Sequence, residues 1–191
     1  MRPSFYSVSY PMLYSVHPPS PFICRYANQL LPGWSCPIAS VLIVLQHAGC
    51  GLVERSPITE TQKHLLRDRF LQIGGAIAAQ LQAQGYHADV FDPKTGLPIL
   101  SQTGRFMDDV AVVRDCLGYG TMEIDGCSIL IHPEWGNSVY PAVLVSSAVP
   151  TVVERVASRV IDTGGLIDNS TSRLRRSEYH HSFIGCGSLT Q

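Results

Sequence analysis

The stretch SVLIVLQ, at residues 40–46, is the clearest strand signal in this chain. It is apolar on both faces of an extended strand and rich in β-branched side chains, which is typical of a central strand covered from both sides. We therefore expect a sheet with packed elements on both of its faces.

A shorter strand and a helix are expected just before this stretch. Residues 12–17 (MLYSVH) have the character of a strand. Ser20 followed by Pro21 is typical of a helix cap and first helical position. Pro32-Gly33 ends that helix, which predicts a helix to about residue 31.

A long amphipathic helix is expected after the central strand. Thr59, with Gln62 three residues later, forms a capping-box pattern that opens a helix, and Gly85 fits its C-terminal end. Apolar side chains recur at spacings of three and four along it, which predicts one buried face. These side chains are Leu66, Phe70, Ile73, Ile77 and Leu81.

In the second half of the chain further strands and helices are expected, with turn residues between them. The expected elements are a strand at 86–92, a helix at about 107–116, and strand-like runs at 127–131 and 139–146 that pair antiparallel. A last helix is expected to begin at Pro150 and to end at Gly164-Gly165. Its side chains Val152, Val156 and Val160 share one face.

This order of elements predicts an α+β fold in a single domain, with a mixed or antiparallel sheet flanked by helices. We expect a short N-terminal lead at 1–11, the domain at 12–165 and a loose C-terminal tail at 166–191, where Ser, Thr, Arg and Gly predominate.

Composition excludes several classes of function. The 191 residues carry 14 Lys and Arg against 15 Asp and Glu, so no excess of positive charge favours binding to nucleic acid. The longest apolar stretch, at 37–45, is about half of the roughly 20 residues that a membrane-spanning helix needs. We therefore expect neither a nucleic acid nor a membrane as a partner.

The six cysteines match no known metal or redox spacing. No two are arranged as C-x-x-C, and a chain of this length folds without disulfides, so reduced thiols are expected. Phosphate-loop and dinucleotide-binding patterns are absent. The pair Asp108-Asp109 is interpreted as the solvated first turn of a helix.

One cluster concentrates chemistry-bearing residues, from Asp125-Gly126-Cys127 to His132 and Trp135-Gly136. A thiol at one end of a strand is followed by an imidazole and an indole near the other. Cys127 and His132 are five residues apart and point to opposite faces of a regular strand, which disfavours a catalytic Cys–His pair. On the residues alone, a buried structural role for Cys127 is favoured.

Two blocks of sequence add a resemblance. The segments AQGYHADVFDPKTGL at 83–97 and GCSILIHPEWGNSV at 126–139 resemble the methylmalonic aciduria and homocystinuria type D protein family, the cobalamin-trafficking D proteins. Residues 15–32 are similar to that family's first strand and helix. The resemblance extends over residues 12–150.

The resemblance implies a non-enzymatic adaptor in intracellular vitamin B12 trafficking. It implies a fold related to flavin-dependent nitroreductases but without the flavin, docking on a cobalamin-processing C-type protein, and cobalamin bound in complex with that partner. The family's functional cysteine offers a thiolate to cobalt, and Cys127 is the matching position. A soft thiolate suits cobalt, whose charge favours loss of the thiol proton. His132 and Trp135 match the motif and are expected to shape the hairpin.

This sequence departs from the family pattern at two places. Animal members carry two adjacent cysteines where this chain has Gly126-Cys127, so a single thiol is expected here. The N-terminal extension that addresses animal members to mitochondria has no counterpart, which implies a cytoplasmic protein.

The alternative hypothesis is a flavin-dependent oxidoreductase of the nitroreductase type. Between residues 87 and 150 the cations are Lys94, Arg105 and Arg114. This is a small set for binding a flavin phosphate, which favours the adaptor.

Overall fold

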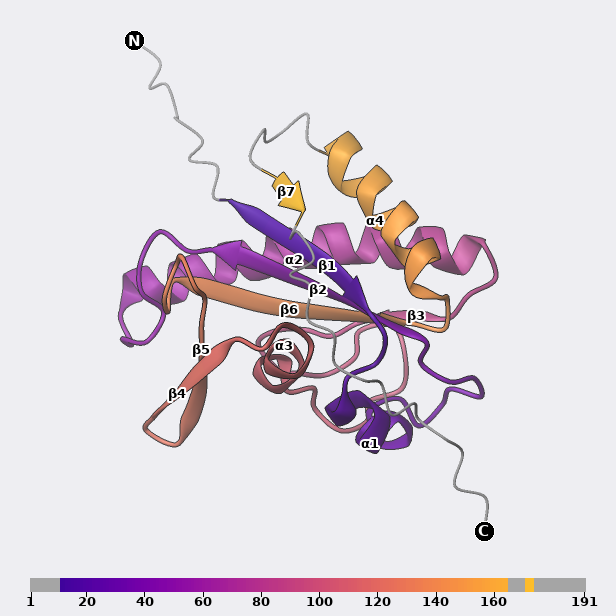
Figure 1. Cartoon of the computed structure of the whole chain (residues 1–191), viewed down its shortest axis with the longest axis horizontal. Coiled ribbons are helices and arrows are strands. Elements are labelled where there is room, and N and C mark those ends of the chain that lie inside the picture. Colours follow the sequence, from indigo (N-terminus) through magenta and orange to yellow (C-terminus); the bar gives the residue numbers. More distant parts are fainter. Residues whose placement is uncertain (1–10, 165–170, 174–191) are drawn as a thin grey trace.

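The computed structural model describes residues 11–164 and 171–173. They form a single α+β domain, as the order of elements predicts (Figure 1). A five-stranded sheet has the strand order β3-β6-β2-β1-β7, and a separate pair of strands, β4 and β5, forms a hairpin at one side.

The strand expected at the centre of the sheet is there. β2 (Ser40–His47) pairs antiparallel with β1 (Met12–His17) on one side and with β6 (Val139–Ser146) on the other. β3 (Ala88–Val90) continues the sheet antiparallel to β6 and is shorter than the strand predicted at 86–92. Beyond β1 the sheet ends in β7 (Thr171–Arg173), which is parallel to β1.

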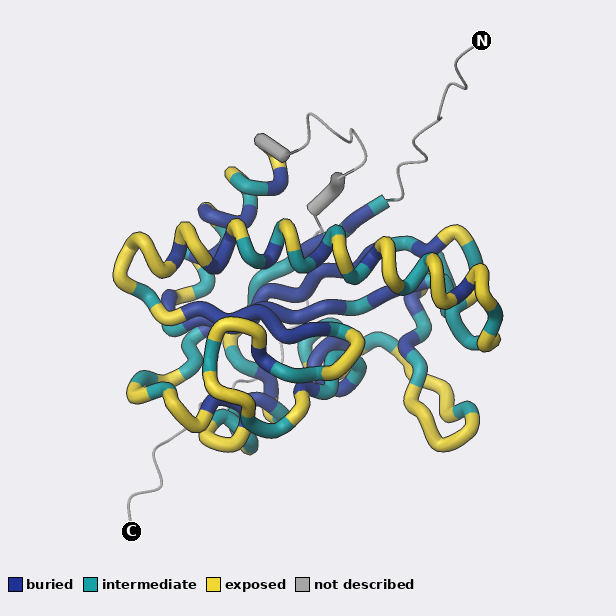
Figure 2. The backbone as a smooth tube through the Cα atoms, turned by 180° about the vertical axis from the view of Figure 1, so that it is seen from behind, coloured by how far each residue is buried: buried dark blue, intermediate teal, exposed yellow. Residues whose placement is uncertain are grey.

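Both faces of β2 are covered, each by its own apolar layer (Figures 1 and 2). Leu42 and Val44 pack against the layer of α2 (Pro57–Ala83) and α4 (Pro150–Gly164). Val41, Ile43 and Leu45 belong to the other layer, with residues of α1 (Pro21–Leu30) and α3 (Asp109–Leu117). The period of two along a strand therefore divides one apolar run between two cores.

The boundaries of two helices follow their capping residues. Ser20 caps α1 as predicted, with its side chain accepting from the Ile23 amide. The prediction that Thr59 begins α2 is wrong, because Ser56 is the cap and its Oγ accepts from the Thr59 amide at 3.2 Å. Pro57 then occupies the first helical position, where no amide hydrogen is needed.

The expected pairing of the runs at 127–131 and 139–146 is wrong. β5 (Cys127–Ile131) pairs with β4 (Gly120–Ile124), whereas β6 lies between β2 and β3. A tight Asp-Gly turn connects β4 to β5, so β5 finds its partner locally.

The last helix buries a different stripe from the one expected. Its buried side chains are Val153, Val156, Ala157 and Ile161, whereas Val152 and Val160 pack only partly buried beside them. Of the expected C-terminal tail, Thr171–Arg173 forms β7, and its other residues lie outside the described part of the chain.

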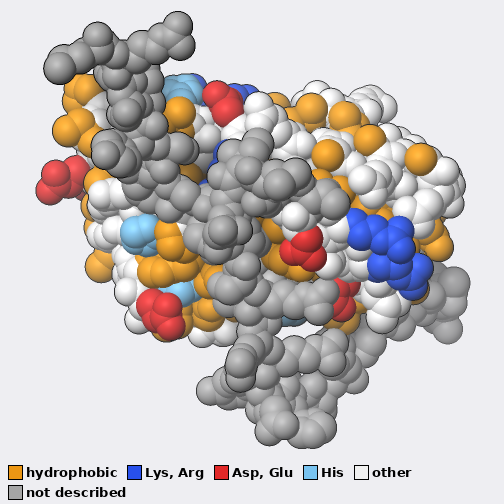
Figure 3. All heavy atoms as spheres, turned by 90° about the horizontal axis from the view of Figure 1, so that it is seen from above, with side chains coloured by type: hydrophobic (Ala, Val, Ile, Leu, Met, Phe, Trp, Pro, Cys, Tyr) orange, Lys and Arg blue, Asp and Glu red, His pale blue; other side chains and the backbone are white. Residues whose placement is uncertain are grey.

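Within residues 11–164 and 171–173, no helix combines the length and apolar character that crossing a bilayer requires. On the face shown in Figure 3, acidic, basic and apolar side chains are interspersed. This mixture agrees with the nearly balanced charge of the sequence.

Candidate functional site: a hairpin with an exposed thiol

The β4–β5 hairpin turns through Asp125 and Gly126. Both residues have positive φ values, 51° and 75°, and Ile124 faces Cys127 directly across the turn. Two consecutive positive φ values are the requirement of a type I′ turn, for which Asp-Gly is a favoured sequence. This turn fixes the register of the hairpin and places Cys127 at its tip.

Cys127 is exposed, which corrects the interpretation that it is a buried structural cysteine. The other free cysteines of the described residues, Cys36, Cys50 and Cys116, are half-buried. Cys24 is disulfide-bonded, so the expectation of reduced thiols fails at that position. Among the described residues, Cys127 therefore offers the most accessible free thiol.

The hairpin projects from the body of the protein with little cover on either of its faces (Figures 1 and 2). In β4 the first four residues are exposed, and in β5 the first two are exposed, whereas Leu130 is buried where the hairpin joins the second core layer. The exposed residues include Met122 and Glu123. The surroundings of Cys127 are therefore open to a partner.

His132 anchors the base of this hairpin. Its ring is buried, with 3% of the residue exposed, and its Nδ1 accepts from the amides of Glu134 and Trp135 at 3.1 and 3.2 Å. Backbone bonds between His132 and Gly136, at 2.8 and 2.9 Å, close the loop, with Gly136 at a φ of 56°. Because Nδ1 is an acceptor, the neutral ring carries its proton on Nε2.

Aromatic contacts attach this loop to the sheet. His132 stacks on Trp135 with ring centroids 4.1 Å apart, and Tyr119 meets His132 edge-on at 5.2 Å. Trp135 in turn contacts His47 at the end of β2, at 5.3 Å. Burial lowers the pKa of His132, with a smaller contribution from His47 in the same direction, against the opposing effect of Glu134. His132 and Trp135 thus lie at the base of the hairpin and contact one another there.

Cys127 and His132 lie at opposite ends of β5. Five strand residues correspond to about 16 Å, so the imidazole cannot act as a base for this thiol. The described residues contain no group of three or more His, Cys, Asp or Glu side chains arranged to hold a metal ion. The hairpin therefore carries one exposed thiol at its tip.

The Asp108-Asp109 pair divides into two different environments. Asp108 caps α3, with its Oδ1 accepting from the Ala111 amide at 2.9 Å, as the first-turn interpretation predicts. Asp109 contradicts that interpretation, because its Oδ1 is buried without a hydrogen-bond partner. Burial, followed by repulsion from Asp108 and Asp92, raises the pKa of Asp109 well above its usual value.

The fold and the hairpin together define a small α+β protein that presents a thiol on a projecting arm. A family model described as Methylmalonic aciduria and homocystinuria type D protein matches residues 22–156. The chain belongs to this family.

The chain is also similar to curated proteins that are named as cobalamin trafficking proteins. The human Cobalamin trafficking protein CblD is 25% identical over 114 residues, which cover 58% of this chain and 38% of the human protein. Its mouse counterpart is 24% identical over 112 residues, covering 56% of this chain and 37% of the mouse protein. The match therefore spans little more than a third of the length of these relatives.

Proposed function

We propose that this chain is a non-enzymatic adaptor in cobalamin trafficking. It docks on a cobalamin-processing partner of the C type and offers the thiolate of Cys127 to the cobalt of the cobalamin that this partner holds. Membership of the D protein family and the names of the curated relatives support the process. The exposed thiol at the tip of the hairpin is the observation that carries the mechanism.

The position of Cys127 suits a ligand delivered to another protein. The hairpin extends about 16 Å from its anchored base, which is long enough to enter a cavity on a partner. Its tip is set by a two-residue turn and its base by the His132 loop, so the arm is preorganised for docking. Preorganisation reduces the entropy lost when the complex forms.

Cobalt is a suitable metal for a cysteine ligand such as Cys127. A coordinated metal ion stabilises a thiolate. A single cysteine at this point implies one sulfur ligand to cobalt.

The test is the ultraviolet-visible spectrum of cob(II)alamin bound to a purified partner, titrated with the wild-type chain, with Cys127→Ser and with Cys36→Ser. Cys36 is a free, half-buried thiol far from the turn in sequence and serves as the matched control. We expect the same spectral change with wild type and Cys36→Ser and no change with Cys127→Ser. Docking of each variant is measured separately by light scattering.

Three results would overturn parts of this proposal. An unchanged spectrum with docked wild type would exclude a cobalt ligand from this chain. An unchanged response in Cys127→Ser would assign it to another residue. Uptake of flavin mononucleotide by the purified protein, with turnover of a nicotinamide reductant, would replace the adaptor by the flavin-dependent oxidoreductase.

A further inference from the structure

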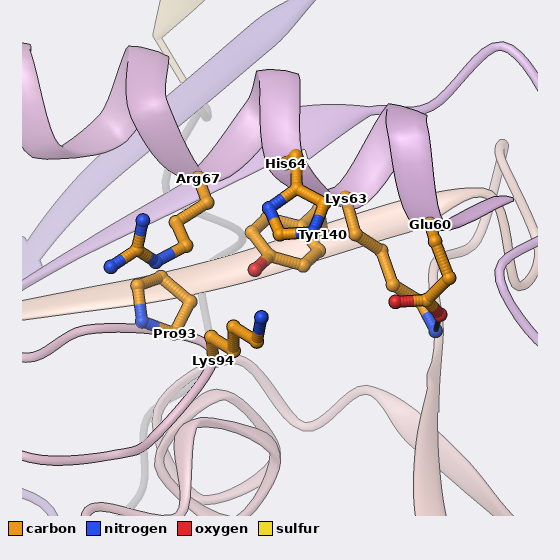
Figure 4. A pocket seen from close by; sticks show the side chains of 7 residues that line it. All are labelled: Glu60, Lys63, His64, Arg67, Pro93, Lys94 and Tyr140. Atoms are coloured by element: carbon orange, nitrogen blue, oxygen red, sulfur yellow. Dashed lines mark hydrogen bonds and ion pairs between the residues drawn. The ribbon is translucent and has the colours of Figure 1, made fainter. Parts of the chain in front are cut away.

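A cavity of about 310 Å³ lies between α2 and the loop that follows β3 (Figure 4). Tyr140 of β6 lies at its floor. A second cavity of about 330 Å³ shares Pro93, Lys94 and Tyr140 with the first, so the two form one groove. These volumes are in the range of small-molecule sites. The first cavity is lined by Glu60, Lys63, His64, Arg67, Pro93, Lys94 and Tyr140.

Three cationic side chains line the first cavity, whereas the second is lined by two acids, Asp108 and Asp109, and shares one of these cations, Lys94. The whole sequence contains two lysines, Lys63 and Lys94, and both line the first cavity together with Arg67. They come from different elements, since Lys63 is on α2 and Lys94 is on the loop opposite. Glu60 is the one acid in this lining, and it pairs with Lys63 at 3.2 Å. The first cavity is therefore net positive.

Asp92 holds two of these residues in place. Arg67 donates to it twice, from Nε at 2.7 Å and from Nη2 at 2.8 Å, and the Lys94 amide donates to Oδ1 at 3.0 Å. A guanidinium has five N–H donors, and Asp92 and Asp68 account for three of them. Arg67 thus keeps donors for a ligand while its orientation is fixed.

Polar groups along the floor continue the groove beyond the cations. In Figure 4 the Tyr140 hydroxyl points toward the space between Arg67 and Lys94. Burial, followed by repulsion from Asp109 and Asp92, raises the pKa of Tyr140, so its hydroxyl stays a donor. Asp109, whose Oδ1 is buried without a partner, lines the second cavity together with the apolar Phe106, Met107 and Pro141.

We propose that this groove binds a phosphorylated small molecule. The phosphate lies among Lys63, Arg67, Lys94 and the Tyr140 hydroxyl, and the organic part extends over Pro93 into the second cavity. Three cationic side chains and a hydroxyl that converge from three elements match a dianion with several acceptor oxygens. No hairpin residue lines either cavity, so this site and the Cys127 thiol are separate.

The experiment is calorimetric titration of the full chain with phenyl phosphate, inorganic phosphate and benzoate at low salt. The variants are Lys94→Gln and Lys63→Gln, with Arg155→Gln as the charge-matched control. Arg155 is exposed on α4 and lines neither cavity. Arg67 is left intact because its loss would leave Asp92 unpaired.

Phenyl phosphate should bind wild type and Arg155→Gln equally and bind Lys94→Gln about tenfold more weakly, the loss expected from one charge-assisted hydrogen bond. Inorganic phosphate should bind more weakly than its phenyl ester because it leaves the second cavity empty. Benzoate binding as tightly as phenyl phosphate would overturn the phosphate assignment. Absence of binding, or equal losses in Lys94→Gln and Arg155→Gln, would overturn the site.

A second readout uses the fact that the chain has two lysines. Acylation by an amine-reactive ester, followed by mass spectrometry, should show both Lys63 and Lys94 protected by phenyl phosphate, with circular dichroism confirming that each sample stays folded. Equal acylation of the two lysines with and without phenyl phosphate would contradict the proposal. Cys127→Ser should bind phenyl phosphate like wild type, so failure here is distinguishable from failure of the adaptor function.

Discussion

β2 and β5 are both short strands, yet they use their side chains in opposite ways. In β2 seven of eight residues are buried, and alternate residues enter two different cores. In β5 one residue, Leu130, is buried, and Cys127 at its first position is exposed. The comparison separates the part of the chain that stabilises the fold from the part available to a partner.

The difference follows from how each strand is paired. β2 has strands on both edges and helices on both faces, whereas within the described residues β5 pairs with β4 alone, across a tight turn. An isolated two-stranded hairpin has marginal stability in water. The His132 loop, with its stacked Trp135, compensates by attaching the hairpin to the end of β2.

The largest effect is expected from truncation in β2. Ile43 is fully buried, so Ile43→Ala should lower the free energy of unfolding by about 3 kcal/mol, through lost burial and a cavity. Met122→Ala, at a position 42% exposed in β4, should change it by less than about 0.5 kcal/mol. Urea denaturation measures the free energy of unfolding of both variants. Similar losses in the two would contradict the difference between β2 and the hairpin.

The next largest effect is expected in the alkylation rates of Cys127 and Cys116. Burial, with a smaller effect of Asp115, raises the pKa of Cys116 to about 12, whereas Cys127 is exposed. Because the thiolate is the nucleophile, iodoacetamide at pH 8 should modify Cys127 at least about a hundredfold faster than Cys116. Mass spectrometry follows each site. Equal rates in the folded protein would contradict the assigned burial, whereas in urea the difference should disappear.

A smaller effect is expected at the turn. Gly126 has a φ of 75° with open space around it, so the alanine of Gly126→Ala meets no clash. The variant should lose about 1 kcal/mol of stability, because alanine is strained at a positive φ. The amides of β4 and β5 should then exchange about fivefold faster with solvent. Gly120→Ala is the matched control, since Gly120 lies in the same hairpin without a positive φ. Equal behaviour of the two variants would exclude the type I′ turn.

The smallest effect concerns pH at the hairpin base. The lowered pKa of His132 means that the unfolded chain binds a proton near pH 6.5 more readily than the folded chain. Stability should therefore fall as pH drops through 6.5, with a slope below the roughly 1.4 kcal/mol per pH unit that one full proton gives. His132→Gln should flatten this slope between pH 7.5 and 5.5, and the exposed His64→Gln should keep it. A slope unaffected by His132→Gln would refute the assignment.

Local patterns predicted most of the fold. Two-sided apolar character identified β2, and the spacing from Leu66 to Leu81 identified the long helix. The start of that helix was misplaced because Ser56-Pro57 and Thr59 are both acceptable starts, and Ser56 is the residue whose side chain caps. Such choices are decided by hydrogen bonds among neighbouring residues.

The site was predicted less completely. Resemblance singled out Cys127, but its exposure depends on the pairing of β4 with β5, for which Asp125-Gly126 was the available signal. The groove around Tyr140 carries no such signal. The residues of its first cavity come from α2, from β6 and from the loop after β3, so only the folded chain brings them together.

X-ray absorption at the cobalt edge reports whether Cys127 binds cobalt. Cob(II)alamin in complex with the partner and the wild-type chain should show a sulfur scatterer in the first coordination shell of cobalt. Cys127→Ser, with docking retained, should lose that sulfur. A first shell of nitrogen and oxygen alone with wild type, or sulfur that persists in Cys127→Ser, would contradict the account.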